Sequence, residues 1–91
     1  MSGGFAPELG ETVLYALSTC IWCRKTRRLL DSLGVPYRLV EVDLLSGEER
    51  EDAHREVHRW SASGSFPVLV INGKRAIQGY MADRIAREFG A

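Results

Sequence analysis

The sequence predicts one α/β domain, built as a four-stranded mixed sheet with helices on both of its faces. Short apolar runs alternate with amphipathic helical patterns in the order β-α-β-α-β-β-α. The chain has 91 residues, the size of a single domain, and 45% of them are hydrophobic, which is enough for a core. The first strand–helix–strand unit should be parallel and right-handed, and the last two strands should form an antiparallel hairpin.

The first third of the chain contains an arm, a buried strand and a helix. Residues 1–10 include three glycines and a proline, so we expect a flexible N-terminal arm, followed by the domain over residues 11–91. Residues 12–17 are almost continuously apolar, which is typical of a strand buried on both faces. From Cys20 onwards, apolar side chains recur three and four residues apart, which predicts a helix that ends at Gly34.

A second strand and a charged helix follow. Residues 37–43 are rich in branched apolar side chains and predict the strand. Ser46 and Glu49 have the spacing of a capping box, in which each side chain accepts a hydrogen bond from the backbone N–H of the other residue. The helix that they open should end near Trp60, and its narrow apolar stripe should cover the sheet from the surface.

The last third predicts a hairpin and a final helix. Residues 68–71 form an apolar strand, and residues 74–78 form its partner. Asn72 and Gly73 lie between them and are the preferred pair for a type I′ turn. Apolar side chains four residues apart over residues 81–89 predict the last helix.

The only two cysteines, Cys20 and Cys23, form a C-x-x-C motif between the first strand and the first helix. A disulfide between them would close only a very short loop and would add little stability. The motif therefore predicts a dithiol redox site rather than a structural disulfide. Residues three apart share one face of a helical turn, and the unpaired N–H groups of a helix N-terminus favour a thiolate at the first cysteine. Four basic residues either add positive potential there or are simply the polar face of the helix: Arg24, Lys25, Arg27 and Arg28.

Composition excludes several functional classes. Twelve basic and twelve acidic side chains cancel, which argues against a nucleic-acid-binding protein. There is no signal-peptide pattern and no apolar run near the about 20 residues that span a membrane, so we expect a cytoplasmic protein. His54 and His58 share a helix face, but 30 residues separate Cys23 from His54. Zinc fingers have a spacing of about 12–15, so no metal site is predicted.

Together with this element order and the C-x-x-C motif, Phe66-Pro67 before the third strand and Gly79-Tyr80 after the fourth resemble the glutaredoxin family of the thioredoxin fold. The resemblance covers residues 11–90, and the NrdH-type redoxins share the same layout. It implies a cis Phe66–Pro67 peptide bond beside the thiols. It also implies a site for glutathione or substrate at Thr19, Trp22, Phe66, Pro67, Gly79, Tyr80 and Asp83.

The positions of the two cysteines on the helix predict different roles. Cys20, at the helix N-terminus, is the expected nucleophile, and Cys23, on the apolar stripe, is the more buried resolving thiol. Trp22 should be exposed and offer a flat apolar contact to a partner. The resemblance implies that the Asp83 carboxylate accepts a hydrogen bond from the ammonium group of glutathione. The alternative is that Asp83 is an ordinary acidic residue in the first turn of a helix, where it interacts favourably with the helix dipole.

The predicted function is thiol–disulfide oxidoreduction on protein or glutathione mixed disulfides by a monomer without a bound cofactor. Glutathione is the expected co-substrate, and glutathione or a flavoprotein reductase would restore the dithiol.

Two alternatives remain open. In a [2Fe–2S] carrier, two subunits would each contribute Cys20, and two glutathione thiols would complete the ligands. Ile21 in place of the proline usual in the family permits this, whereas Leu17 in place of a glutathione-binding lysine weakens it. In a redox-inert binding module, a groove between Phe66 and Tyr80 would carry the function.

Overall fold

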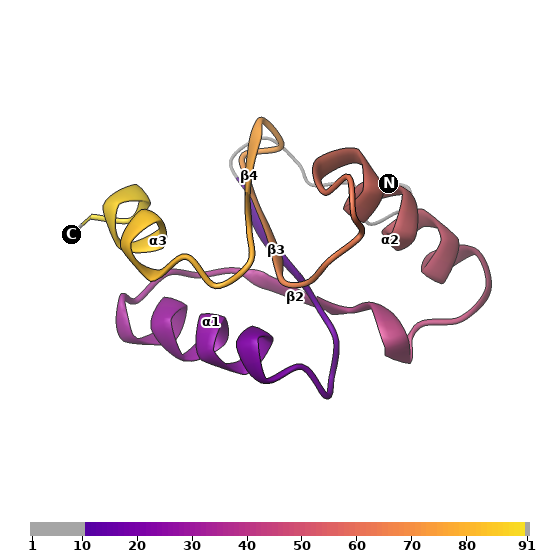
Figure 1. Ribbon diagram of the computed structural model, residues 1–91, viewed down its shortest axis with the longest axis horizontal. Coiled ribbons are helices and arrows are strands. Elements are labelled where there is room, and N and C mark those ends of the chain that lie inside the picture. The colour runs from indigo at the N-terminus through magenta and orange to yellow at the C-terminus, as the bar shows by residue number, and fades with distance from the viewer. Residues whose placement is uncertain (1–10, 91) are drawn as a thin grey trace.

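The computed structural model describes residues 11–90 and confirms the predicted order of elements. The predicted arm over residues 1–10 lies outside the described residues. The central sheet has the strand order β2-β1-β3-β4, with β1 parallel to β2 and antiparallel to β3, and β3 antiparallel to β4 (Figure 1). The elements are β1 (Thr12–Ala16), α1 (Ile21–Ser32), β2 (Arg38–Glu41), the 3₁₀ turn η1 (Val42–Leu44), α2 (Gly47–Trp60), β3 (Val68–Ile71), β4 (Arg75–Gln78) and α3 (Ala82–Glu88).

Helices cover both faces of the sheet because the two central strands are apolar on both sides. Val13 and Tyr15 of β1 face α2, whereas Leu14 and Ala16 face α1 and α3. The alternation follows from the two-residue period of a strand. Figure 1 shows α2 on one side of the sheet and α1 and α3 on the other. Cys23 belongs to the cluster on the α1 side, so one cysteine is part of the core.

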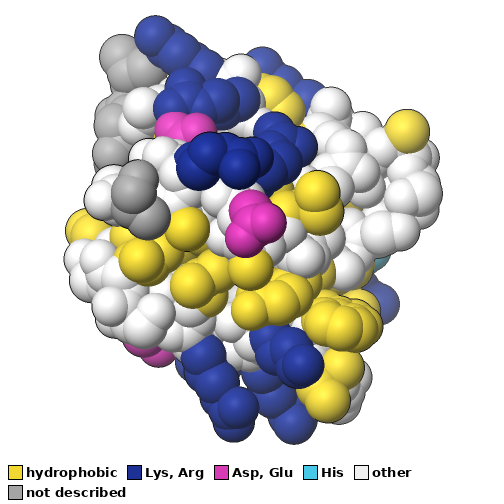
Figure 2. Space-filling model, turned by 60° about the vertical axis from the view of Figure 1, so that its left-hand side comes forward, with side chains coloured by type: hydrophobic (Ala, Val, Ile, Leu, Met, Phe, Trp, Pro, Cys, Tyr) yellow, Lys and Arg dark blue, Asp and Glu magenta, His cyan; other side chains and the backbone are white. Residues whose placement is uncertain are grey.

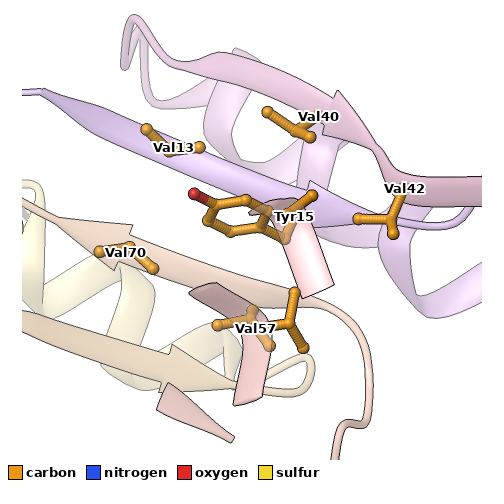
Figure 3. Close-up of a cluster of buried hydrophobic side chains, with 8 residues drawn as sticks. Val13, Tyr15, Val40, Val42, Val57 and Val70 are labelled. Atoms are coloured by element: carbon orange, nitrogen blue, oxygen red, sulfur yellow. The ribbon is translucent and has the colours of Figure 1, made fainter. Parts of the chain in front are cut away.

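The core beneath α2 is built around Tyr15. Its ring lies among valines from β1, β2, β3 and α2, with no exposed surface (Figure 3). Burial raises the pKa of the Tyr15 hydroxyl above its ordinary value, with the nearby carboxylate of Glu56 as the second cause. The core on this side of the sheet is therefore closely packed, and the two thiols lie on the other side.

The α1 helix ends as the sequence predicts. Gly34 has a φ of 70°, which places it in the left-handed region where glycine is favoured. The Val35 N–H then donates to the Leu30 C=O at 3.0 Å, the long bond of a Schellman motif. In the hairpin between β3 and β4, Asn72 and Gly73 both have positive φ, and the Lys74 N–H donates to the Ile71 C=O, as expected for a type I′ turn.

Two local predictions were wrong. The second strand ends at Glu41 rather than at residue 43, because β1 ends at Ala16, the partner of Glu41, and the chain beyond has no strand to pair with. Ser46 is the N-cap of α2, but its side chain makes no capping hydrogen bond. Gly47 has a φ of 62°, so the chain enters the helix through a bend that does not align the Ser46 hydroxyl with the first turn.

The parallel pairing of β1 and β2 brings together two residues that lie 25 positions apart. Ala16 pairs with Glu41, so Ser18 and Asp43 each lie two residues beyond the paired ends, at the same edge of the sheet. Asp43 accepts two hydrogen bonds from Ser18, from the backbone N–H at 2.9 Å and from the hydroxyl at 2.5 Å. These bonds, with the positive charge of Arg50, hold the pKa of the Asp43 carboxyl below its ordinary value. We call this contact the Ser18–Asp43 clamp.

In the part of the chain that the structure describes, no helix has the length and apolar character required to cross a membrane.

The packing of α1 against the sheet predicts a contrast between two leucines. Leu30 is fully buried, and its replacement by alanine should lower the free energy of unfolding by about 2–5 kcal/mol through lost contacts and a residual cavity. Leu44 is 65% exposed, so Leu44→Ala should change it by less than about 0.5 kcal/mol. Urea denaturation of both variants checks this, and equal losses would contradict the assignment of Leu30 to the core.

The Ser18–Asp43 clamp predicts a stability that depends on pH. A carboxyl whose pKa is lowered by folding stabilises the folded state above its unfolded pKa of about 3.9, and this contribution is lost as the pH falls through the folded pKa. Asp43→Asn cannot ionise. Its stability deficit relative to wild type should therefore be full at pH 6 and shrink below about pH 4. Urea midpoints across this range measure it, and a deficit that stays constant would show that the charge of Asp43 is irrelevant.

Candidate active site

The two cysteines lie on the first turn of α1, with Cys20 as the N-cap residue. The Cys20 backbone is extended, and its Sγ accepts a hydrogen bond from the Cys23 N–H at 3.2 Å. A cysteine thus takes the position at which serine, threonine or aspartate usually accepts this bond. Both thiols are free, and Cys20 is partly exposed whereas Cys23 is only 1% exposed. The predicted difference in accessibility is confirmed.

Burial sets the chemistry of Cys23. It raises the pKa of the Cys23 thiol to about 12, and the hydrogen bond with Cys20 and the negative charges of Cys20 and Asp43 act in the same direction. At neutral pH this thiol keeps its proton. The arrangement combines an accessible sulfur that receives an N–H with a protonated sulfur one turn behind it.

Aromatic side chains border the cysteines. The Trp22 and Tyr80 rings stack with centroids 5.9 Å apart and planes at 28°, which joins α1 to the turn before α3. The Lys25 Nζ lies 4.9 Å from the Trp22 ring centroid, within the range of a cation–π contact. Trp22 is 52% exposed and Ile21 is 60% exposed, so the residues between the cysteines form an apolar surface beside Cys20.

The third side of the site is the Phe66–Pro67 segment, whose peptide bond is cis, as the resemblance implied. Phe66 packs against the cluster that holds both cysteines. The Pro67 C=O accepts a hydrogen bond from the Gly79 N–H at 2.8 Å, which ties the start of β3 to the turn after β4. Gly79 has a φ of 79°, a conformation that other residues rarely adopt.

Thr19 and Asp83 lie at the margins. Thr19 is exposed in the turn before Cys20, where the Cys20 N–H donates to the Leu17 C=O at 3.2 Å. Asp83 is exposed in the first turn of α3 and lines a hollow of about 480 Å³. The other residues around this hollow are Met81, Ala82, Arg84 and Arg87. The structure thus gathers most of the predicted residues around the thiols and places Asp83 on the surface of α3.

Two features of the site were missed by the sequence analysis. The Ser18–Asp43 clamp holds the loop that precedes Cys20, and Lys25 packs on Trp22. The clamp did have a signal: Ser18 and Asp43 both follow strands that were predicted to be parallel, and such strands end at one edge of the sheet. The cation–π contact had none, because a lysine three residues after a tryptophan is common on a helix.

Within residues 11–90, no group of three or more histidine, cysteine, aspartate or glutamate side chains is arranged to hold a metal ion. His54 and His58 stack on each other with ring centroids 6.4 Å apart on α2, the helix on the opposite face of the sheet from Cys20.

Comparison with known proteins identifies relatives of this arrangement. The glutaredoxin family model matches residues 12–76. The methanoredoxin of Methanosarcina acetivorans is 42% identical, with 94% of this chain and 90% of that chain covered at a TM-score of 0.85. The glutaredoxin of Methanosarcina mazei Go1 is 43% identical, with 94% and 84% covered at the same TM-score. The curated glutaredoxin of Ricinus communis is 35% identical over 63 residues, which are 68% of this chain and 59% of that protein.

The matches to curated relatives span between 15% and 60% of the lengths of those proteins. The family match runs from β1 into β4 and includes both cysteines and the Phe66–Pro67 segment. Sheet topology and solved relatives agree on a thioredoxin-like fold. On this evidence the chain belongs to the glutaredoxin family.

Proposed function

We propose that the protein is a dithiol oxidoreductase that reduces disulfides of proteins and glutathione mixed disulfides. The observation that carries the proposal is the pairing on the first turn of α1. One sulfur is accessible and accepts an N–H, and the other is buried and protonated. Membership of a family of thiol–disulfide oxidoreductases supports it.

In the first step, the Cys20 thiolate attacks one sulfur of the substrate disulfide. The Cys20–substrate bond forms, the substrate S–S bond breaks, and the other substrate sulfur leaves as a thiolate that takes a proton from water. The helix N-terminus stabilises the negative charge of the attacking sulfur through the Cys23 N–H.

In the second step, Cys23 loses its proton to water and attacks the Cys20 sulfur. A Cys20–Cys23 disulfide forms, the Cys20–substrate S–S bond breaks, and the substrate sulfur leaves as a thiolate that takes a proton from water. The first step prepares the second, because the Cys20 sulfur in a mixed disulfide carries no negative charge. Two of the influences that raise the pKa of Cys23, the hydrogen bond with Cys20 and its charge, then disappear. Cys23 therefore becomes easier to ionise only after substrate has been captured.

We further propose glutathione as the co-substrate, with glutathione or a flavoprotein reductase as the source of electrons and no bound cofactor. The surface around Thr19, Trp22, Phe66, Pro67, Gly79 and Tyr80 borders Cys20 and suits a small peptide thiol, and Asp83 stays a prediction as a ligand for its ammonium group. The protein would act as a cytoplasmic monomer on disulfide-containing protein substrates.

The division of labour predicts unequal effects of two serine substitutions. Cys20→Ser should reduce activity to that of the uncatalysed reaction, because it removes the nucleophile. Cys23→Ser should keep part of the activity on glutathionylated substrates, because free glutathione can resolve the mixed disulfide. Reduction of a glutathionylated peptide, coupled to glutathione and glutathione reductase, measures both. Equal residual activities would contradict the assigned roles.

The pKa of Cys23 predicts its alkylation profile. In Cys20→Ser the influences of Cys20 are removed, but burial, the largest cause of the raised pKa of Cys23, remains. The rate of Cys23 alkylation by iodoacetamide should therefore be low at pH 8 and still be rising above pH 9, because only the thiolate reacts. The same variant in denaturant is the control and should level off above about pH 9, as an unperturbed cysteine does. A native profile that already levels off at pH 9 would show that burial does not hold the proton on Cys23.

A further inference from the structure

The chain has no net charge, yet its charges are separated between the two faces of the sheet. The α1 helix carries four basic side chains and one acidic side chain, a formal charge of +3. The α2 helix, on the opposite face, carries five acidic and three basic side chains, a formal charge of −2. The positive helix is the one that begins at Cys20.

Within residues 11–90, none of the four basic side chains of α1 forms an ion pair with a described carboxylate. Elsewhere arginines do find partners: Arg55 pairs with Asp52 and Arg59 with Glu56 on α2, and Arg75 pairs with Glu88. Among the described residues, Arg50, Lys74, Arg84 and Arg87 also lack an ion pair, so α1 is distinguished by having four such side chains on one helix that begins at Cys20.

The surface beside these residues is hollowed. One hollow of about 390 Å³ runs between α1 and the turn before α3, and is lined by Lys25, Arg28, Leu29, Ser32 and Tyr80. A second, of about 210 Å³, is lined by Arg24, Arg27, Arg28 and Asp31. Arg28 borders both. Figure 2 shows two groups of Lys and Arg side chains, one in the upper part of the view and one at the lower edge, where α1 lies, next to a band of hydrophobic side chains.

We propose that the α1 face is a docking surface for an acidic polypeptide segment that presents its disulfide to Cys20. The α1 face is defined by Arg24, Lys25, Arg27, Arg28 and Leu29. This inference rests on the proposed function and specifies the substrate class: proteins whose reactive cysteine is flanked by carboxylates. Unpaired guanidinium groups bind carboxylates with good geometry, and a patch of one sign of charge accelerates the encounter with an oppositely charged partner.

The dimensions of α1 specify the spacing of the acidic residues. A helix rises about 1.5 Å per residue, so Arg24 lies about 6 Å and Arg28 about 12 Å along the axis from Cys20. An extended peptide advances about 3.3 Å per residue. Carboxylates two to four residues from the substrate cysteine would therefore reach Arg24 and Arg28 while its sulfur meets Cys20. The Leu29 and Tyr80 side chains would contact the apolar parts of the same segment.

The partner favoured by these observations is a polypeptide rather than a nucleic acid. The chain as a whole has no net charge, and the basic side chains of α1 are bordered by apolar ones, whereas nucleic-acid-binding domains are usually basic as a whole. The acidic α2 on the far face would repel any polyanion long enough to wrap around the molecule.

The test uses three synthetic peptides, each carrying one cysteine as a mixed disulfide with glutathione. The positions two to four residues from the cysteine are Glu in the first, Gln in the second and Lys in the third. At about 10 mM ionic strength, kcat/KM for the Glu peptide should exceed that for the Gln peptide by about tenfold, and the Lys peptide should be slowest. At about 1 M salt, where the screening length is about 3 Å, the three values should converge. Equal values at low salt overturn the proposal.

Two double variants locate the effect. Arg27→Glu with Arg28→Glu should reverse the order of the Glu and Lys peptides. The matched control, Arg55→Glu with Arg59→Glu, alters net charge equally on α2 and should keep the original order. The rate for the Gln peptide is the reference in each variant, so changes in thiol reactivity cancel. If the charge-reversed variant does not fold, Arg27→Gln with Arg28→Gln takes its place, and it should lower the preference for the Glu peptide over the Lys peptide. A preference that persists in these α1 variants overturns the proposal.

A binding measurement separates this proposal from the proposed function. In Cys20→Ser with Cys23→Ser, titration with a cysteine-free version of the Glu peptide should shift the backbone amide signals of α1 and not those of α2. If the peptides are not reduced but these shifts appear, the docking surface stands and the oxidoreductase assignment fails. Absent α1 shifts, or tighter binding of a single-stranded oligonucleotide than of the Glu peptide, overturn the docking of an acidic polypeptide.

Discussion

The hydrogen bond from the Cys23 N–H to the Cys20 sulfur joins the folding of α1 to the chemistry of the site. A helix needs an acceptor at its N-cap, and this helix uses the sulfur of its candidate nucleophile. The same turn of helix places Cys23 on the apolar stripe, in the cluster with Leu30 and Ile85. One geometric requirement therefore exposes one thiol, buries the other and sets the distance between them.

The rest of the molecule holds this turn in place from three directions. The Ser18–Asp43 clamp fixes the chain that enters it, the Trp22–Tyr80 stack joins it to the turn before α3, and the sheet supports it from below. The Pro67–Gly79 hydrogen bond closes the arrangement by holding the segment opposite Cys20. Each contact links segments far apart in the chain, so the site depends on the complete sheet and cannot form from the C-x-x-C peptide alone.

Features with local causes were predictable from the sequence. The strand alternation, the end of α1 at Gly34 and the Asn72-Gly73 turn follow from the side chains at those positions. Ser46 was misjudged because its role depends on the backbone conformation of Gly47, which sequence spacing does not reveal. The length of β2 was misjudged because the end of its partner strand β1 determines where it stops. Val42 is apolar and would fit a strand as well as the 3₁₀ turn in which it lies, so its side chain does not reveal the boundary. The orientation of Trp22 toward Tyr80 depends on tertiary packing across 58 residues, which no local pattern contains.

The separation of charge between α1 and α2 gives this neutral protein an electric dipole component that crosses the sheet. A molecule without net charge is only weakly attracted to charged molecules at long range, so it binds few of them non-specifically. A dipole nevertheless experiences a torque in the field of such a partner, and turns before the two surfaces touch. The face that begins at Cys20 rotates toward negative charge. Orientation, rather than accumulation, is then what the charge pattern contributes to an encounter, and it lasts only over the few nanometres or less that salt leaves unscreened.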